Sequence, residues 1–179
     1  MTRMSKKLYI GLLLVTFALL FLCGLPALFL LNSYDIPRSM GIDDDLTNLL
    51  VGVLIFLSVA PFLFTQIILS YVLIYKMWSS IQGGRSTRTS PGKAVGFLFI
   101  PFFNLYWLFQ VWAGFPTDYN HYLEEHSLPI PKLSQGLYIA YPVSILLPFF
   151  SILLAPFVLI FVTAKTCDAV NRLADAKRA

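Results

Sequence analysis

The residues best suited to metal coordination lie close together, at His121, Glu124, Glu125 and His126. Imidazole nitrogens and carboxylate oxygens are common ligands of zinc, so His121, Glu124 and His126 are candidates for a metal site. Helical zinc motifs place two histidines four residues apart or use a His-x-x-Glu-His pattern, whereas these two histidines are five apart. We therefore expect a solvated loop on the outer side of a membrane, with no bound metal.

Other sequence signatures of catalysis are missing from the chain. The sequence has no P-loop pattern, no Gly-x-Ser-x-Gly nucleophile elbow and no Cys-x-x-Cys pair. Charged and histidine side chains are also absent from the middle of its long apolar segments, where ion-driven carriers and proton pumps normally place them. We therefore expect a protein that is not an enzyme and that holds no cofactor.

A few residues inside the apolar segments could either pack helices together or line a path through the membrane. Asn104 is the polar residue nearest the middle of its segment, and Pro101 removes a backbone hydrogen-bond donor and should kink the helix. We favour the packing interpretation, in which interhelical hydrogen bonds contribute about 0.6 kcal/mol each. The candidates for helix packing or pore lining are Gly92, Gly96, Pro101, Asn104, Trp107, Gln66 and Gln110.

The composition identifies the class of protein that must position these residues. Of the 179 residues, 58% are hydrophobic and only 12% are charged, and the mean hydropathy is +0.75. A soluble domain carries roughly twice that share of charge, about 25%. These values exclude a disordered chain, a nucleic-acid-binding domain and an ordinary cytosolic enzyme. They predict an integral membrane protein.

Four apolar segments are each longer than the roughly 20 residues that cross about 30 Å of hydrocarbon as a helix. They lack the alternating pattern of barrel strands, and only helices or closed barrels satisfy their backbone groups in lipid. We therefore predict an all-α membrane protein, a four-transmembrane-helix bundle that forms a single domain. The predicted helices cover residues 8–31, 48–75, 91–115 and 136–164, and an amphipathic tail over 165–179 rests on the membrane surface or continues the fourth helix.

The distribution of lysine and arginine predicts the orientation of these helices. Eleven of the thirteen lie at the N-terminus, in the loop after the second segment and in the C-terminal tail. Only Arg38 and Lys132 fall in the two remaining loops. By the positive-inside rule, the N-terminus and the C-terminus are both predicted to be cytoplasmic, in a multi-pass protein of the cell (inner) membrane.

The loop after the second segment is basic and contains Lys76, Arg85, Arg88 and Lys93. Each cation near an anionic membrane surface contributes roughly 1 kcal/mol of binding, so these residues are candidates for contact with lipid headgroups. The interpretation that we favour is simpler, because the same charges are needed to set the topology.

The second half of the chain resembles a family of small membrane proteins. The segments PGKAVGFLFIPFFNLYW (91–107), FPTDYN (115–120) and TCDAVNRL (166–173) are similar to uncharacterised multi-pass bacterial membrane proteins of the domain-of-unknown-function type. The resemblance implies a bacterial protein and brings no activity, ligand or catalytic residue. Its Pro-Phe-Phe-Asn break raises an alternative in which the third segment is re-entrant, residues 118–132 are cytoplasmic and the tail is outside. The four cations of the tail argue against that alternative.

Three hypotheses for the function follow from these features. The leading one is a non-catalytic accessory or structural subunit, which packs against other integral membrane subunits or against copies of itself and contacts membrane lipids but no nucleic acid. The alternative is an oligomeric channel or facilitator whose path is lined by Asn104, Gln66 and Gln110. The third is a membrane enzyme that acts at the outer surface through the periplasmic loop with His121, Glu124 and His126.

Overall fold

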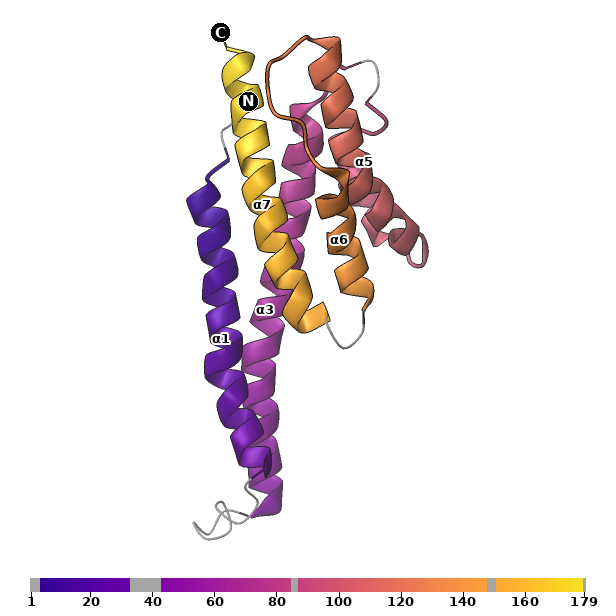
Figure 1. The fold of residues 1–179 in the computed structure, drawn as a ribbon. Helices are drawn as coiled ribbons and strands as arrows, with labels where there is room; N and C mark the ends of the chain where they lie inside the picture. Colours follow the sequence, from indigo (N-terminus) through magenta and orange to yellow (C-terminus); the bar gives the residue numbers. More distant parts are fainter. Residues whose placement is uncertain (1–3, 33–42, 85–86, 148–150, 179) are drawn as a thin grey trace. The chain divides into compact units, whose positions relative to one another are not determined.

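The computed structural model describes residues 4–32, 43–84, 87–147 and 151–178. Helices make up 83% of the structure and the described residues contain no β-strand (Figure 1), so the predicted all-α class is confirmed. In chain order the elements are α1 (Lys6–Asn32), α3 (Asp44–Ser80), α4 (Pro91–Gly96), the 3-10 helix η1 (Phe97–Phe99), α5 (Phe103–Glu125), α6 (Gln135–Leu146) and α7 (Ser151–Ala176).

Three of these helices contain stretches that are long and apolar enough to cross a membrane. The stretches are Lys6–Pro26 in α1, Asp45–Ser80 in α3 and Leu154–Ala176 in α7. The predicted helices 8–31 and 48–75 therefore correspond to α1 and α3. The other two predicted helices differ from the structure.

The third predicted helix, 91–115, is interrupted, so the prediction of one continuous helix is wrong. α4 ends at Gly96, η1 ends at Phe99, and α5 begins only at Phe103. Pro101 has no amide hydrogen, and Phe102 adopts a positive φ of 61°, which a continuous right-handed helix does not allow. α5 then continues to Glu125, through the residues that were expected to form a polar turn and an outer loop.

The fourth predicted helix, 136–164, is divided between α6 and α7. α6 ends at Leu146, and Pro148 follows in the sequence. A proline disfavours helical backbone in the residue before it and offers no amide for the helix to continue, which explains the division. Most of the predicted tail continues α7 as far as Ala176, which is one of the two arrangements expected for it.

The chain divides into two compact units, each described by itself. Unit 1 comprises Met1–Ile10 and Leu69–Ala179, and unit 2 comprises Gly11–Ile68. In unit 2, α1 and α3 pack as an antiparallel pair: a Cβ built on Gly24 would lie 3.9 Å from Ser58 Oγ, and the rings of Phe17 and Phe62 are 6.2 Å apart.

The core of unit 1 is built from aromatic side chains of α3, α5 and α6. Trp78, Trp112, Phe115, Tyr119 and Tyr138 are fully buried. Trp78 and Phe115 meet edge to face, with ring centroids 6.0 Å apart, a geometry that suits the quadrupoles of the two rings. This core holds α5 against the last turns of α3.

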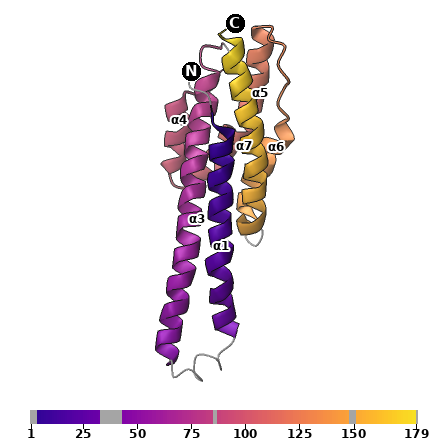
Figure 2. The same ribbon diagram turned by 90° about the vertical axis from the view of Figure 1, so that its left-hand side faces the viewer.

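Buried hydroxyl groups fix α6 within unit 1, where it packs against both α5 and α7 (Figure 1 and Figure 2). The Tyr138 hydroxyl lies 2.7 Å from Thr166 Oγ1 on α7, and the Tyr141 hydroxyl lies 3.0 Å from Ser70 Oγ on α3. Both hydrogen bonds are buried, so each satisfies two polar groups that would otherwise be costly to bury.

Candidate functional site

The interrupted third segment folds as a helical hairpin, which we define as residues 91–107 and call the aromatic hairpin. Its first leg, α4, begins after the N-cap Ser90, whose hydroxyl accepts a hydrogen bond from the Lys93 amide at 3.4 Å. Its second leg is the first turn of α5. The indole Nε1 of Trp107 donates a hydrogen bond to the carbonyl of Ala94 at 3.1 Å, which joins the two legs.

Trp107, a packing candidate in the sequence, forms the centre of the aromatic hairpin. Its ring is 4.9 Å from that of Phe97, which meets it edge to face, and 5.6 Å from that of Phe103, which is stacked on it. Phe97 and Phe103 are themselves 5.8 Å apart. The hairpin is therefore closed by three mutually packed rings as well as by the indole hydrogen bond.

The turn of the aromatic hairpin is strained and exposed. Phe99, Ile100 and Phe102 are 67%, 45% and 90% exposed. The positive φ of Phe102 costs on the order of 1–3 kcal/mol for a residue that is not glycine. Packing within the chain does not offset this strain, because the ring of Phe102 is almost fully exposed.

A buried ion pair joins the chain before the aromatic hairpin to the helix after it. Arg88 Nε lies 2.8 Å from Asp118 Oδ1, and the backbone amide of Arg88 donates to Asp118 Oδ2 at 3.0 Å. Asp118 is 2% exposed, whereas the arginine side chain is about half exposed. Both carboxylate oxygens are therefore satisfied by one residue, which makes the geometry of the contact specific.

This ion pair contradicts the predicted positions of its partners. Arg88 was expected in a cytoplasmic loop and Asp118 in an outer loop, on opposite sides of a helix that crosses about 30 Å of hydrocarbon. A contact of 2.8 Å places both residues at the same end of unit 1. The sequence signal that pointed to this arrangement was the Pro-Phe-Phe-Asn break that begins at Pro101.

A second contact at the same end of unit 1 centres on Tyr122 of α5. The ring of His126 is stacked on it at 4.1 Å, and Lys177 Nζ lies 4.6 Å from its centroid. Lys177 also donates a hydrogen bond to the carbonyl of Ser80 at 2.8 Å. A Cβ built on Gly84 would lie 2.7 Å from Tyr122 Cδ2. The ends of α3, α5 and α7 therefore meet around one tyrosine ring.

We expect Gly84→Ala to lower the free energy of unfolding by about 1–3 kcal/mol, because its new methyl group would overlap the ring of Tyr122. His126 and Lys177 both contact that ring, so it cannot move aside without losing these contacts. Gly92→Ala is the matched control, since nothing lies within 4 Å of the Cβ position there. Denaturant titration in detergent micelles, followed by circular dichroism, compares the two variants. Equal stability of the two would contradict the prediction.

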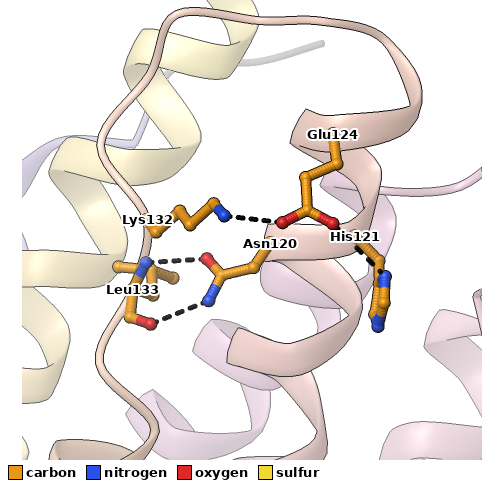
Figure 3. A network of polar contacts seen from close by, with 5 residues as sticks. All are labelled: Asn120, His121, Glu124, Lys132 and Leu133. Atoms are coloured by element: carbon orange, nitrogen blue, oxygen red, sulfur yellow. Dashed lines mark hydrogen bonds and ion pairs between the residues drawn. The ribbon is translucent and has the colours of Figure 1, made fainter.

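The metal candidates lie at the C-terminal end of α5, not in a loop, and their side chains do not converge. His121 Nδ1 lies 3.7 Å from Glu124 Oε2, and the other carboxylate oxygen of Glu124 accepts a hydrogen bond from Lys132 Nζ at 2.6 Å. This hydrogen bond lowers the pKa of Glu124. Figure 3 shows these side chains. His126 Nδ1 instead lies 3.0 Å from the carbonyl of Tyr122. Among the described residues, no group of three or more His, Cys, Asp or Glu side chains is placed to hold a metal ion.

The same view shows how the extended segment after α5 is held in place (Figure 3). Asn120 Nδ2 donates a hydrogen bond to the carbonyl of Leu133 at 2.9 Å, and the amide of Leu133 donates to Asn120 Oδ1 at 2.8 Å. The side chain of Asn120 thus forms with Leu133 the two hydrogen bonds that the backbone of a neighbouring strand would form. The polar residues at this end of α5 therefore position the connection to α6.

The polar pore candidates are not gathered into one path within either unit. Gln66 belongs to unit 2, whereas Asn104 and Gln110 belong to α5 in unit 1. Six residues separate Asn104 from Gln110, which places them on different faces of a helix with 3.6 residues per turn. Gly92 and Gly96 have nothing within 4 Å of their Cβ positions, so neither is a point of close helix contact within the chain.

The candidates for contact with lipid headgroups are in different environments. Lys76 Nζ lies 5.5 Å from the ring of Tyr9, and the Arg88 guanidinium is engaged by Asp118. Lys93 is exposed in α4. Arg85 lies outside the described residues. Two of the four cations therefore have structural contacts within unit 1.

The N-terminal residues are bound to the end of α7, a contact that sequence reasoning did not find. The amide of Met4 donates to Asn171 Oδ1 at 2.8 Å, and Asn171 Nδ2 donates to the carbonyl of Met4 at 3.0 Å. Lys6 Nζ donates to Asp168 Oδ2 at 2.7 Å. Met4 and Lys6 therefore lie beside the last turns of α7.

These features describe an all-helical protein with three helices compatible with membrane crossing and an aromatic hairpin between two of them. Searches against models of known protein families, against curated proteins and against solved structures find no match to this chain. The function is therefore argued from the residues and their geometry.

Proposed function

We propose that the chain is a multi-pass protein of the bacterial inner membrane and that the polar end of unit 1 faces the cytoplasm. Twelve of its thirteen lysines and arginines belong to unit 1, and the exception is Arg38. The positive-inside rule favours the cytoplasm for a region with such an excess of cations. The contacts of Asn171 with Met4 and of Arg88 with Asp118 support a common side for the termini and the loops of unit 1.

In this proposed topology, α1 and α3 cross the membrane, whereas the aromatic hairpin and the α6–α7 pair enter and leave on the cytoplasmic side. The residues between α6 and α7 in the sequence, 147–150, are all apolar, as a connection within hydrocarbon requires. The connections over 81–90 and 126–134 are instead rich in polar residues and proline. The composition of the connections thus supports two crossings and two re-entrant elements.

Within the membrane, we propose that the protein is a non-catalytic accessory or structural subunit that packs through α1 and α3 against other membrane helices or a second copy of itself. The observation that carries this proposal is the apolar surface of the two helices. Only 18% of the apolar stretch of α1 and 17% of that of α3 are buried within the chain, compared with 50% in α7. Leu22, Phe29, Phe56 and Phe64 are each 60–70% exposed.

The use of the charged groups supports a role without catalysis. Asp118 is engaged by Arg88, Asp168 by Lys6, and Glu124 by Lys132. The first two pairs each join segments that are distant in the sequence. The third joins α5 to the connection that follows it. In these contacts the charged groups join parts of the chain to one another, which agrees with the proposed structural role.

The oligomeric state tests the subunit proposal. We expect the protein, purified in a mild detergent or in nanodiscs, to form a homo-oligomer of defined stoichiometry or to retain one partner chain at a fixed ratio. Native mass spectrometry and light scattering measure both. Recovery of a monomer alone under these conditions would show that lipid is what covers α1 and α3.

Cysteine cross-linking locates the contact. The chain has two cysteines, so Cys23 and Cys167 are first replaced by alanine. A Phe56→Cys variant, at a position that is 68% exposed on α3, should then form a cross-link with a bifunctional maleimide. Ser127→Cys, at an exposed position after α5, is the matched control and should stay uncross-linked. Equal cross-linking at the two positions would reject α3 as the contact surface.

A further inference from the structure

We propose that the turn of the aromatic hairpin inserts into the hydrocarbon of one membrane leaflet and binds lipid acyl chains. Phe99 and Phe102, in the turn, are 67% and 90% exposed, and Tyr106, one helical turn further along in α5, is 58% exposed. Exposed apolar surfaces of this kind mark sites of interaction. The inference rests on the proposed membrane location but not on the proposed role as a subunit.

The position of the turn against α3 places it at the level of the apolar part of that helix. The rings of Phe99 and Tyr71 meet edge to face, with centroids 5.2 Å apart. Tyr71 is nine residues before Ser80, the last residue of α3, which corresponds to about 14 Å along the helix. Half of a hydrocarbon core is about 15 Å thick. The turn therefore lies well below the polar end of unit 1.

The charge pattern of the hairpin agrees with this depth. No charged residue or histidine occurs between Lys93 and Asp118. Lys93 is exposed near the start of the first leg, where the proposed topology places lipid headgroups, and the Arg88–Asp118 pair lies outside the hairpin, eleven residues beyond its last residue on α5. The hairpin thus has charges at its base and only uncharged residues at its turn.

The backbone of the turn is largely satisfied by its own hydrogen bonds, as lipid requires. The amide of Ile100 donates to the carbonyl of Phe97 at 3.3 Å, and the amide of Asn104 donates to the carbonyl of Ile100 at 2.9 Å. The amide of Phe103 donates to the carbonyl of Pro101 at 2.7 Å, and the proline itself has no amide hydrogen. A turn of this composition can enter hydrocarbon without leaving these donors exposed to it.

Acyl chains suit this surface better than a protein partner does. Phe99 contacts Tyr71 on the part of α3 that belongs to unit 1, whereas the exposed residues argued to contact a protein partner, such as Phe56 and Phe64, belong to unit 2. Phe102 also projects from the turn at 90% exposure, and the strain in its backbone is offset if the ring is transferred from water into hydrocarbon. A second copy of the chain is the competing occupant, and the experiment distinguishes it.

Depth-dependent fluorescence quenching tests the proposal on the full chain. An environment-sensitive fluorophore is attached at Phe102→Cys in the protein that lacks Cys23 and Cys167, reconstituted in phosphatidylcholine–phosphatidylglycerol vesicles. We expect nitroxide groups in the middle of the acyl chains to quench it about twofold more than nitroxides on the headgroups. Ser127→Cys is the control and should show the reverse order. Phe99→Cys repeats the measurement if Phe102→Cys does not fold.

Two results would overturn the proposal. If aqueous iodide quenches the label at Phe102→Cys as strongly as it quenches the label at Ser127→Cys, the turn lies in water. The label at Phe102→Cys could instead be quenched by neither iodide nor acyl-chain nitroxides, while Phe102→Cys cross-links between two chains. That result would place a second copy over the turn. A turn in water would also reject the re-entrant hairpin of the proposed topology. Neither result bears on the oligomer formed through α1 and α3, so the subunit proposal is tested separately.

Discussion

Replacement of Arg88 by methionine should lower the free energy of unfolding by about 3 kcal/mol, because it leaves a buried carboxylate without its charged partner. Asp118 is 2% exposed, and its Oδ1 lies 2.8 Å from Arg88 Nε. Methionine retains most of the apolar stem of arginine. The loss of stability therefore measures the contribution of the guanidinium charge and of its hydrogen bond to Asp118. Titration with a denaturing detergent, followed by tryptophan fluorescence, measures the change.

Two further variants distinguish a buried ion pair from a general effect of removing charge. The double variant Arg88→Met with Asp118→Leu should recover much of the lost stability, because no charge is left buried. Lys132→Met removes the cation that pairs with Glu124 at 2.6 Å, but both of those side chains are more than half exposed. An exposed pair contributes little, so this control should behave like the unmodified protein. Equal losses for Arg88→Met and Lys132→Met would contradict the argument.

Labelling with a membrane-impermeant maleimide should reach Thr89→Cys and Ser127→Cys from the same side of the membrane. Thr89 precedes the aromatic hairpin and Ser127 follows α5, and the Arg88–Asp118 contact between these segments joins the two ends. The expected effect is all or none, because a label that cannot cross the bilayer reaches only one side. All variants are made in the protein that lacks Cys23 and Cys167. Intact spheroplasts expose the outer side of the membrane to the label, and inverted vesicles expose the cytoplasmic side.

The controls for this experiment define its outcomes. Asp45→Cys, exposed in the first turn of α3, should be labelled from the opposite side, because α3 is proposed to cross the membrane. Labelling of Thr89→Cys and Ser127→Cys from opposite sides would restore the four-span bundle and reject the re-entrant hairpin. Labelling of all three from one side would reject the crossing of α3.

The sequence determined the all-α class and the position of the first two helices, although α3 extends several residues beyond the predicted range at both ends. α1 and α3 form from long runs of apolar residues with no charge, and their hydrogen bonds are local, so composition and length were enough to predict them. Single prolines at Pro26 and Pro61 do not end these helices. A local signal is sufficient when the element needs no distant partner to define its ends.

The tertiary structure decided which of the later apolar segments form continuous helices. Length and hydropathy are the same for a crossing helix and for two legs of a hairpin. The difference lies in Phe102 at positive φ and in the Arg88–Asp118 contact, whose partners are thirty residues apart. Apolar periodicity carries no information about such a pairing, because it arises only when α5 packs against the end of α3 and brings Asp118 to the loop that contains Arg88.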